Sequence, residues 1–198
     1  MIIIVFIIAY LLGSIPFGLL ISRLKGVDIR AYGSGNIGAT NVLRIVGKKE
    51  AVITLIADML KGATAVIIAR AAGVDNAWVA SAGICSIIGH NYSVFLGFKG
   101  GKGVATSFGV LSAYLPIVAA ISVAIWIITV ILWRYSSLGA IVSFLCLPLL
   151  VTVFNYSLIN LIFSLAISLM IIYRHRENIK RLIDGTEGKI GKKVYVDK

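Results

Sequence analysis

Long apolar runs, separated by short polar segments, are the feature of this sequence that most constrains its fold. A helix needs about 20 apolar residues to cross the hydrocarbon core of a membrane. Runs of about that length or more cover residues 1–21, 51–72, 104–133 and 138–173, and a shorter run covers 77–89. Only 14% of the residues are charged, against about 25% in a typical soluble domain. We therefore expect an all-α integral membrane protein and exclude a soluble domain that binds nucleic acid.

The basic residues decide how many times the chain should cross the membrane. Cytoplasmic loops of membrane proteins are enriched in Lys and Arg. Segment 22–50 and the tail 174–198 carry most of the 19 Lys and Arg residues, so both should face the cytoplasm. This requires the run 104–133 to form two short helices that meet at Pro116, which places 17 of the 19 basic residues on one side. We predict about seven transmembrane helices in a single domain, residues 1–198, with the N-terminus outside and the C-terminus in the cytoplasm. The third and fourth passes are short enough to be re-entrant instead.

Two further features exclude other arrangements. The first apolar run has no Lys or Arg before it and no cleavage site of small residues after it, so we expect a retained transmembrane helix and not a signal peptide. Cys85 and Cys146 lie in apolar runs with no second Cys or His at ligand spacing. We expect buried thiols and no metal site.

The first cytoplasmic segment contains a glycine-rich run, residues 33–44, that opens a helix. Asn36 is placed to cap this helix, and Gly47 to follow its last residue. Free N–H groups at a helix start attract anions, and Thr40 and Arg44, four residues apart, project from one face. We interpret the run as a phosphate or oxyanion cradle with a charged clamp; the alternative is a flexible turn between two spans. Its candidate phosphate ligands are Asn36, Thr40 and Asn41.

The second cytoplasmic segment, residues 90–103, combines glycines with lysine directly before a predicted helix. Its candidates for phosphate binding are His90, Gly97, Gly100, Gly101, Lys102 and Gly103. Backbone N–H groups of such a loop can form an anion-binding nest, to which the lysine adds charge. The loop is not a Walker A motif, because three residues separate Gly97 from Gly101 and a glycine stands where Ser or Thr would bind magnesium. For His90 alone, a hydrogen-bonded histidine at a helix end is an equal alternative.

The C-terminal segment, residues 174–198, begins with a polar helix. His175 and Asn178 are three residues apart and so share one face, while Glu177 and Arg181 are spaced to form an ion pair. The remaining basic residues of this segment are typical of a helix that is attracted to anionic lipid headgroups.

Asp58 and Lys61 lie inside the apolar run 51–72. Charges within a span are costly and are usually paired or functional. We expect these two to neutralise each other and to orient their helix. A transporter of an organic phosphate would need a polar site near the membrane midplane, and only these two charges lie that deep. We therefore favour an enzyme whose site is at the cytoplasmic ends of the helices.

Four motifs together resemble those of the bacterial acyl-phosphate:glycerol-3-phosphate acyltransferase family (PlsY type). They are GSIPFG (13–18), GSGNIGATNVLR (33–44), GHNYSVFLGFKGGKGVAT (89–106) and RHRENIKRL (174–182). The resemblance implies an integral enzyme of the bacterial cytoplasmic (inner) membrane, with its active site facing the cytoplasm. It would move a fatty acyl group from acyl phosphate to the 1-hydroxyl of glycerol 3-phosphate. The products would be lysophosphatidic acid and phosphate, and acyl-CoA would not be needed.

The resemblance also implies roles for particular residues. The family's catalytic serine, arginine, histidine and asparagine fall on Ser34, Arg44, His175 and Asn178. Its glycine-rich site for glycerol 3-phosphate falls on 97–103. Its structural glutamate falls on Glu177 or Glu187, of which we favour Glu177. The expected partners are glycerol 3-phosphate, fatty acyl phosphate, membrane lipids and the enzyme that makes acyl phosphate, and no cofactor is implied.

An acyl phosphate is already activated, so its transfer needs mainly orientation and stabilisation of the developing oxyanion. We expect direct transfer without an acyl-enzyme, with Arg44 and Lys102 holding the substrates. The proton acceptor is left open between His175 and a phosphate oxygen of the substrate.

Overall fold

The computed structural model describes residues 1–191, and these are helices and loops with no strand. Three basic residues of the predicted tail, Lys192, Lys193 and Lys198, lie outside the described residues. The α-helices are α1 (Ile2–Ser14), α2 (Phe17–Arg23), α3 (Ala39–Ile45), α4 (Lys48–Ala71), α5 (Asn76–Asn91), α6 (Val104–Tyr114), α7 (Pro116–Trp133), α8 (Ser136–Phe154), α9 (Leu158–Arg174) and α10 (Arg176–Ile183). Two short 3-10 turns, η1 (Ile29–Ala31) and η2 (Val94–Leu96), lie in the polar loops.

The apolar runs are helical as predicted, but not all of the helices are long enough to cross a membrane. By length and composition five stretches could do so: α1 with α2, α4, α5 with η2, α7 and α8. A sixth would be α9 with α10, which are bent by 57° relative to each other. The run 104–133 does divide at Pro116, the first residue of α7. However, α6 has 11 residues, or about 16 Å of helix, against a hydrocarbon core of roughly 30 Å. The candidate spans among residues 1–191 are therefore fewer than the seven predicted.

Pro16 breaks the first apolar run into α1 and α2, which the sequence analysis treats as one helix. A proline lacks the backbone N–H that would continue the helical hydrogen bonds, so carbonyl groups near the break need other donors. The hydroxyl of Ser93 donates to the carbonyl of Ser14 (2.6 Å), and Nζ of Lys61 donates to that of Ile15 (2.8 Å). Side chains from α4 and the second loop thus hold the break in place.

Glycines let the helices of the first half pack backbone against backbone. A Cβ on Gly13 of α1 would overlap the backbone of Ser86 in α5, and one on Gly109 of α6 would overlap the carbonyl of Met59 in α4. Small residues at helix crossings are typical of membrane proteins. One apolar core extends from these helices into α7, α8 and α9 and includes Val66, Leu111, Phe144, Phe163 and Ile167.

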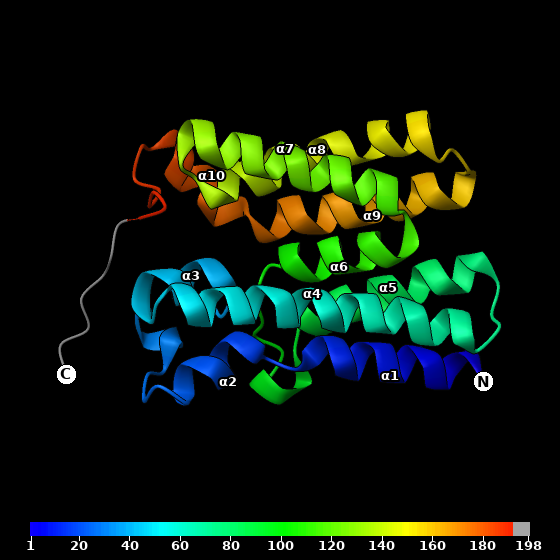
Figure 1. Cartoon of the computed structure of the whole chain (residues 1–198), viewed down its shortest axis with the longest axis horizontal. Coiled ribbons are helices and arrows are strands. Elements are labelled where there is room, and N and C mark those ends of the chain that lie inside the picture. The colour runs from blue at the N-terminus through cyan, green and yellow to red at the C-terminus, as the bar shows by residue number, and fades with distance from the viewer. Residues whose placement is uncertain (192–198) are drawn as a thin grey trace.

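Figure 1 shows the helices lying along the long axis of the molecule. The N-terminus lies at one end, together with the turns from α4 to α5 and from α8 to α9. At the opposite end lie α3, α10 and the turn from α7 to α8. Segments 22–50 and 174–191 therefore meet at one end of the bundle, and the short α6 does not reach that end.

Candidate active site

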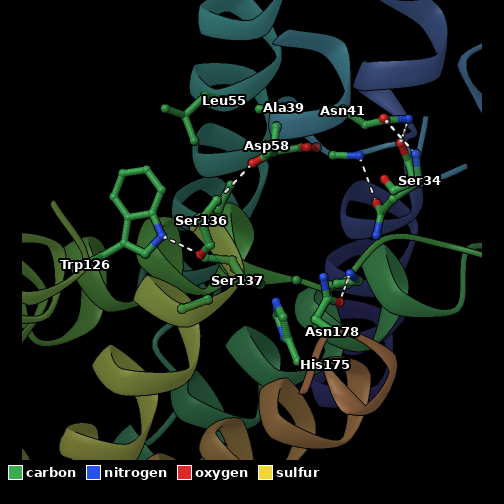
Figure 2. A pocket seen from close by; sticks show the side chains of 18 of the residues that line it. Ser34, Ala39, Asn41, Leu55, Asp58, Trp126, Ser136, Ser137, His175 and Asn178 are labelled. Carbon is green, nitrogen blue, oxygen red and sulfur yellow. Dashed lines mark hydrogen bonds between the residues drawn. The ribbon is translucent and has the colours of Figure 1, made fainter. Parts of the chain in front are cut away.

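A cavity of about 130 Å³ lies where the polar segments meet. Figure 2 shows Ser34 and Asn41 on one side of it, Trp126 and Ser136 on the other, and His175 and Asn178 pointing into it. The predicted site residues that line it are Ser34, Asn36, Thr40, Asn41, Arg44, His90, Lys102, Gly103, His175 and Asn178. The three polar segments that the sequence analysis singled out thus share one cavity.

Asn41 organises the first glycine-rich loop from within. Its Oδ1 accepts the N–H of Ser34 (3.1 Å), and its Nδ2 donates to the carbonyls of Ile29, Tyr32 and Asn36 (3.3, 3.1 and 3.0 Å). Only 2% of Asn41 is exposed. Its amide is occupied by the loop itself, so Asn41 supports Ser34 in this structure, and its role as a phosphate ligand stays a prediction.

The cap of α3 lies two residues later than predicted, at Gly38 and not at Asn36. Gly38 is the residue before its first turn, and Oδ1 of Asn36 accepts the N–H of Gly38 (2.9 Å), forming a turn that precedes the helix. Thr40, in the first turn of α3, lies with its hydroxyl 3.0 Å from that of Ser136 at the start of α8. Gly47 follows α3 after one further residue, as predicted.

Arg44 reaches across the cavity from the last turn of α3. Its guanidinium donates to the carbonyl of Gly188 (2.6 Å), in the segment that follows α10. Burial lowers the pKa of Arg44, but an arginine pKa starts so high that the group stays charged at neutral pH. Among the described residues the guanidinium donates only to this neutral carbonyl and forms no direct ion pair, which leaves its charge available to an anion.

The second glycine-rich loop does not form the predicted nest of free N–H groups. The N–H of Gly100 donates to the carbonyl of Asn91 (3.1 Å), and that of Gly101 donates to the carbonyl of His90 (3.0 Å). Arg174 donates to the carbonyls of both glycines. Gly97 and Gly101 do not line the cavity, and Gly100 lines only an adjoining hollow of about 220 Å³. The donors that this loop offers are Lys102 and the free N–H groups at the start of α6.

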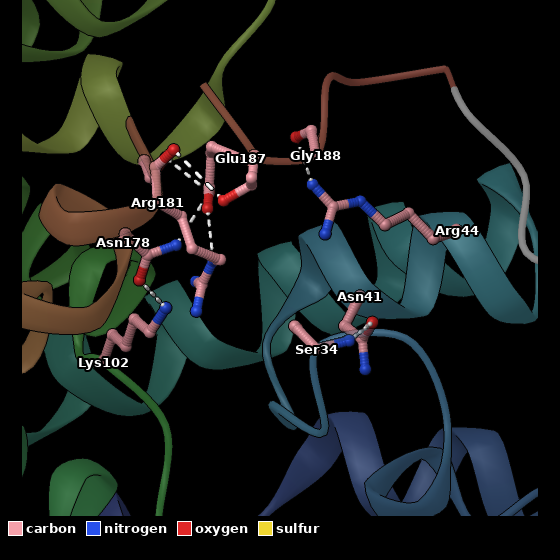
Figure 3. Close-up of polar contacts among 10 residues, drawn as sticks. Ser34, Asn41, Arg44, Lys102, Asn178, Arg181, Glu187 and Gly188 are labelled. Carbon is pink, nitrogen blue, oxygen red and sulfur yellow. Dashed lines mark hydrogen bonds and ion pairs between the residues drawn. The ribbon is translucent and has the colours of Figure 1, made fainter. Parts of the chain in front are cut away.

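Lys102, Asn178 and Glu187 form a chain of hydrogen bonds beside the cavity (Figure 3). Nζ of Lys102 donates to Oδ1 of Asn178, whose Nδ2 donates to Oε1 of Glu187 (2.7 Å). Ser137 donates to the same carboxylate oxygen (2.7 Å), and Arg181 donates to the other (2.7 Å). Burial lowers the pKa of Lys102 to about 8. Burial opposes ionisation of Glu187, but the hydrogen bonds from Ser137, Arg181 and Asn178 outweigh it and lower the pKa of this carboxyl.

The glutamate at the site is Glu187, so the preference for Glu177 is corrected. The Glu177 side chain is 75% exposed and lies 3.9 Å from Arg176, away from the cavity. The predicted ion pair between Glu177 and Arg181 is not formed, because Arg181 pairs with Glu187 instead. Helical spacing explains this difference. Glu177 is two positions after His175, so it points away from the face that His175 and Asn178 share.

His175 is 3% exposed and terminates α9. Its Nδ1 lies 2.8 Å from the carbonyl of Ile171. A carbonyl can only accept, so Nδ1 carries the hydrogen and Nε2 is left as a hydrogen-bond acceptor. The ring points into the cavity, as Figure 2 shows, so Nε2 is placed to accept a proton from a bound molecule.

Asp58, Lys61 and His90 form a buried group behind the cavity. Asp58 Oδ1 lies 2.8 Å from Lys61 Nζ, which confirms the predicted pairing, and 3.7 Å from His90 Nδ1. All three residues are at most 4% exposed. His90 therefore has a carboxylate beside it within the protein, but at a distance longer than the hydrogen bond that the alternative of a helix-end histidine expects.

Five lining residues were not predicted from the sequence. Ser136 and Ser137 begin α8, and Leu55, Trp126 and Ala140 form an apolar wall from α4, α7 and α8. The indole of Trp126 donates to the carbonyl of Ser136 (3.3 Å), which fixes the ring at the cavity. No local pattern marks these positions; only the packing of α7 and α8 against the polar segments brings them to the site.

Comparisons with known proteins agree with this arrangement. The chain matches the family described as glycerol-3-phosphate acyltransferase over residues 3–185. The glycerol-3-phosphate acyltransferase of Geotalea daltonii is 48% identical over 179 residues, covering 90% of this chain and 92% of that protein. That of Aquifex aeolicus is 49% identical over 183 residues, covering 91% and 95%.

Two solved structures have the same fold. Both are crystal structures of PlsY (YgiH), an integral membrane glycerol 3-phosphate acyltransferase, one in its glycerol 3-phosphate form and one in its lysophosphatidic acid form. Their TM-scores are 0.91 and 0.89 at 46% and 45% sequence identity, and each comparison covers 96% of both chains. A family match over almost the whole chain and a shared membrane fold lead to one conclusion: this chain belongs to the glycerol-3-phosphate acyltransferase family of PlsY type.

Proposed function

We propose that this protein transfers a fatty acyl group from acyl phosphate to the 1-hydroxyl of glycerol 3-phosphate. Lysophosphatidic acid and phosphate leave as products. The observation that carries the proposal is the cavity in which Arg44, Lys102 and His175 surround a space with an apolar wall at Leu55 and Trp126. The relatives named glycerol-3-phosphate acyltransferase and the two forms of PlsY support the acceptor and the product.

The two substrates account for the two kinds of cavity wall. Both bear phosphate, which Arg44 and Lys102 can bind through charge-assisted hydrogen bonds. One also bears a long acyl chain, which suits the apolar residues Leu55, Trp126 and Ala140 in a protein that lies within lipid. A donor that arrives from the membrane and an acceptor that arrives from water can therefore meet at the end of the bundle.

The reaction needs orientation more than acid catalysis. The 1-hydroxyl oxygen attacks the acyl carbonyl carbon, the bond from that carbon to the phosphate oxygen breaks, and phosphate leaves with the electron pair. Nε2 of His175 or an oxygen of the departing phosphate takes the hydroxyl proton. Ser34, Arg44 and Lys102 stabilise the charge that develops, and Asn178 holds Lys102 in place. Glu187 serves as the structural carboxylate of this group.

The position of the polar segments supports an active site on the cytoplasmic side of the membrane. The described basic residues of segments 22–50 and 174–198 lie at the end of the bundle that holds the cavity. By the positive-inside rule this end faces the cytoplasm of a bacterium, with the N-terminus outside and seven passes through the inner membrane, of which α6 is a short one. The enzyme that makes acyl phosphate is then the partner expected on this face.

The donor is tested with purified protein in detergent or vesicles. Glycerol 3-phosphate is offered with palmitoyl phosphate or with palmitoyl-CoA, and lysophosphatidic acid is measured. We expect product from the acyl phosphate alone. Product from acyl-CoA alone would show that the donor assignment is wrong, while the acceptor assignment would stand.

Direct transfer has its own test at Ser34. The protein is incubated with labelled acyl phosphate in the absence of glycerol 3-phosphate, denatured and treated with hydroxylamine, which cleaves acyl esters. We expect no protein-bound label. A hydroxylamine-sensitive acyl group on Ser34 would establish a covalent intermediate instead.

A further inference from the structure

The buried group Asp58, Lys61 and His90 has no part in the proposed acyl transfer, yet it adjoins the cavity. Burying a carboxylate and an ammonium costs free energy that their mutual attraction often does not recover. The carboxylate of Asp58 has two neighbours, Lys61 at 2.8 Å and His90 at 3.7 Å. Both Asp58 and His90 also line the cavity. These contacts connect the ion pair to the site through the imidazole ring.

The ring of His90 supports the turn that leads to Lys102. A Cβ on Gly101 would overlap Nε2 of His90, so the backbone of the turn lies directly against the ring. The N–H groups of Gly100 and Gly101 donate to the carbonyls of Asn91 and His90. The glycine turn is therefore built on the last residues of α5, and any rotation of the His90 ring must displace it.

Arg174 holds the turn from the other side. Its guanidinium donates to the carbonyls of Gly100 (3.0 Å) and Gly101 (2.7 Å) and lies 5.2 Å from the centre of the Tyr92 ring. The turn is thus enclosed between His90 and Arg174. The next residue, Lys102, extends to Asn178 at the cavity, so its ammonium takes its position from this enclosed turn.

We propose that Asp58 is a positioning residue for acyl transfer: it fixes the ring of His90, the ring supports the glycine turn, and the turn sets where Nζ of Lys102 lies. The inference rests on the proposed role of Lys102 in holding substrate phosphate. Lys61 balances the charge of Asp58 and ties α4 to the carbonyl of Ile15. A displacement of about 1 Å in a binding group can lower a rate about 100-fold. Even a small shift of Lys102 after loss of Asp58 should therefore have a large effect on acyl transfer.

If the pair of Asp58 and Lys61 served stability alone, removing both charges would change the kinetic constants in a different way than the proposal predicts. Replacing a buried ion pair by apolar residues of similar shape is often neutral for stability, so the variant D58L/K61M should fold. A smaller folded fraction lowers kcat and leaves KM unchanged. A displaced Lys102 weakens phosphate binding and raises KM.

The kinetic test compares two variants that both lack the charges. In D58L/K61M the His90 ring loses its oxygen neighbour. We expect KM for glycerol 3-phosphate or acyl phosphate to rise at least about tenfold, which is less than the roughly 100-fold cost of a full 1 Å misplacement. D58N/K61M keeps an oxygen beside His90 and should regain most of that loss. D75N removes an exposed carboxylate at the far end of α5 and serves as the control with unchanged KM. An unchanged KM in D58L/K61M would overturn the proposal.

Hydrogen exchange tests the same inference without activity. The amides of Gly100 and Gly101 should exchange at least about tenfold faster in D58L/K61M, while those of α7 and α8 keep their rates. If D58L/K61M does not fold, D58N/K61M is compared with the parent, and a smaller acceleration at the same two amides is expected. Equal exchange at the turn in every folded variant would overturn the proposal. Failure of the parent protein to acylate glycerol 3-phosphate would instead refute the proposed function, because the exchange result does not depend on it.

Discussion

Lys61 and Lys102 are both largely withdrawn from solvent, but they differ in what compensates their charge. Lys61 lies 2.8 Å from the carboxylate of Asp58, so the two charges form a pair. Lys102 donates instead to the neutral amide of Asn178, and the carboxylate of Glu187 is reached only through that amide. The charge of Lys102 is therefore available to a phosphate group, whereas that of Lys61 is already neutralised.

Arg44 follows the pattern of Lys102. Its guanidinium donates to the carbonyl of Gly188, another neutral acceptor. Figure 3 shows Arg44 and Lys102 approaching the same region from opposite sides, from α3 and from the loop before α6. Pairing with neutral partners orients both cations without cancelling their charge. A site built in this way is preorganised for anions, while the direct ion pairs around it, Asp58 with Lys61 and Glu187 with Arg181, involve other cations.

Of the predicted effects, the largest is the loss of stability when the charge of Lys61 is removed. In K61M the carboxylate of Asp58 stays buried without its cation, which costs about 3–5 kcal/mol in comparable pairs. Heat-induced unfolding of the purified protein in detergent should therefore occur at a clearly lower temperature. D58L/K61M, which removes both charges, should recover most of the loss. Unfolding of K61M at the parent's temperature would show that Lys61 does not compensate Asp58.

Removing the charge of Lys102 should act on catalysis and leave stability almost unchanged. K102M takes away a cation whose partner is neutral, so no buried charge is left behind. Loss of a buried charged contact to a ligand costs about 2–5 kcal/mol, and we expect kcat/KM to fall about 100-fold or more. Steady-state kinetics and unfolding are measured on the same preparation. The comparison between the two lysines fails if K102M loses stability and retains its kinetics.

Glu187 and Glu177 should also differ in their contribution to stability, by a smaller amount than Lys61 and Lys102. E187Q weakens the charge-assisted hydrogen bond from Arg181, and we expect a loss of about 1–3 kcal/mol in stability. E177Q changes an exposed side chain and should stay within about 0.5 kcal/mol of the parent. Unfolding temperatures of the two variants are compared. Equal losses in both would contradict the assignment of Glu187 as the structural glutamate.

Most of the residues that meet at the cavity were predictable from local chemistry. The glycine-rich runs indicated Arg44 and Lys102, and helical spacing put His175 and Asn178 on one face, whereas Ser34 came from the family resemblance. The pairing of Asp58 with Lys61 followed from the cost of an isolated charge in lipid. Such features depend on neighbours within one or two helical turns, which a sequence displays directly.

The features that the sequence did not predict depend on contacts between distant segments. Glu187 is held by Ser137, 50 residues away in the chain, and the N–H groups of Gly100 and Gly101 are occupied because the turn folds back on α5. The inward amide of Asn41 is a further example. Hydropathy likewise identifies an apolar run without giving the length of each helix in it, so the sequence did not predict that α6 has only 11 residues.

The pH dependence of the reaction gives the smallest and most specific effect. Burial lowers the pKa of Lys102 to about 8, so the ammonium is present below that pH and is lost above it. Because kcat/KM reports groups of the free enzyme, it should fall to about half of its pH 7 value near pH 8 and to about a tenth near pH 9. K102R keeps its charge throughout this range, since the pKa of arginine lies above 12, and the decline should move to higher pH. A decline at the same pH in K102R would assign the titration to another group and would leave the charge of Lys102 without a role in substrate binding.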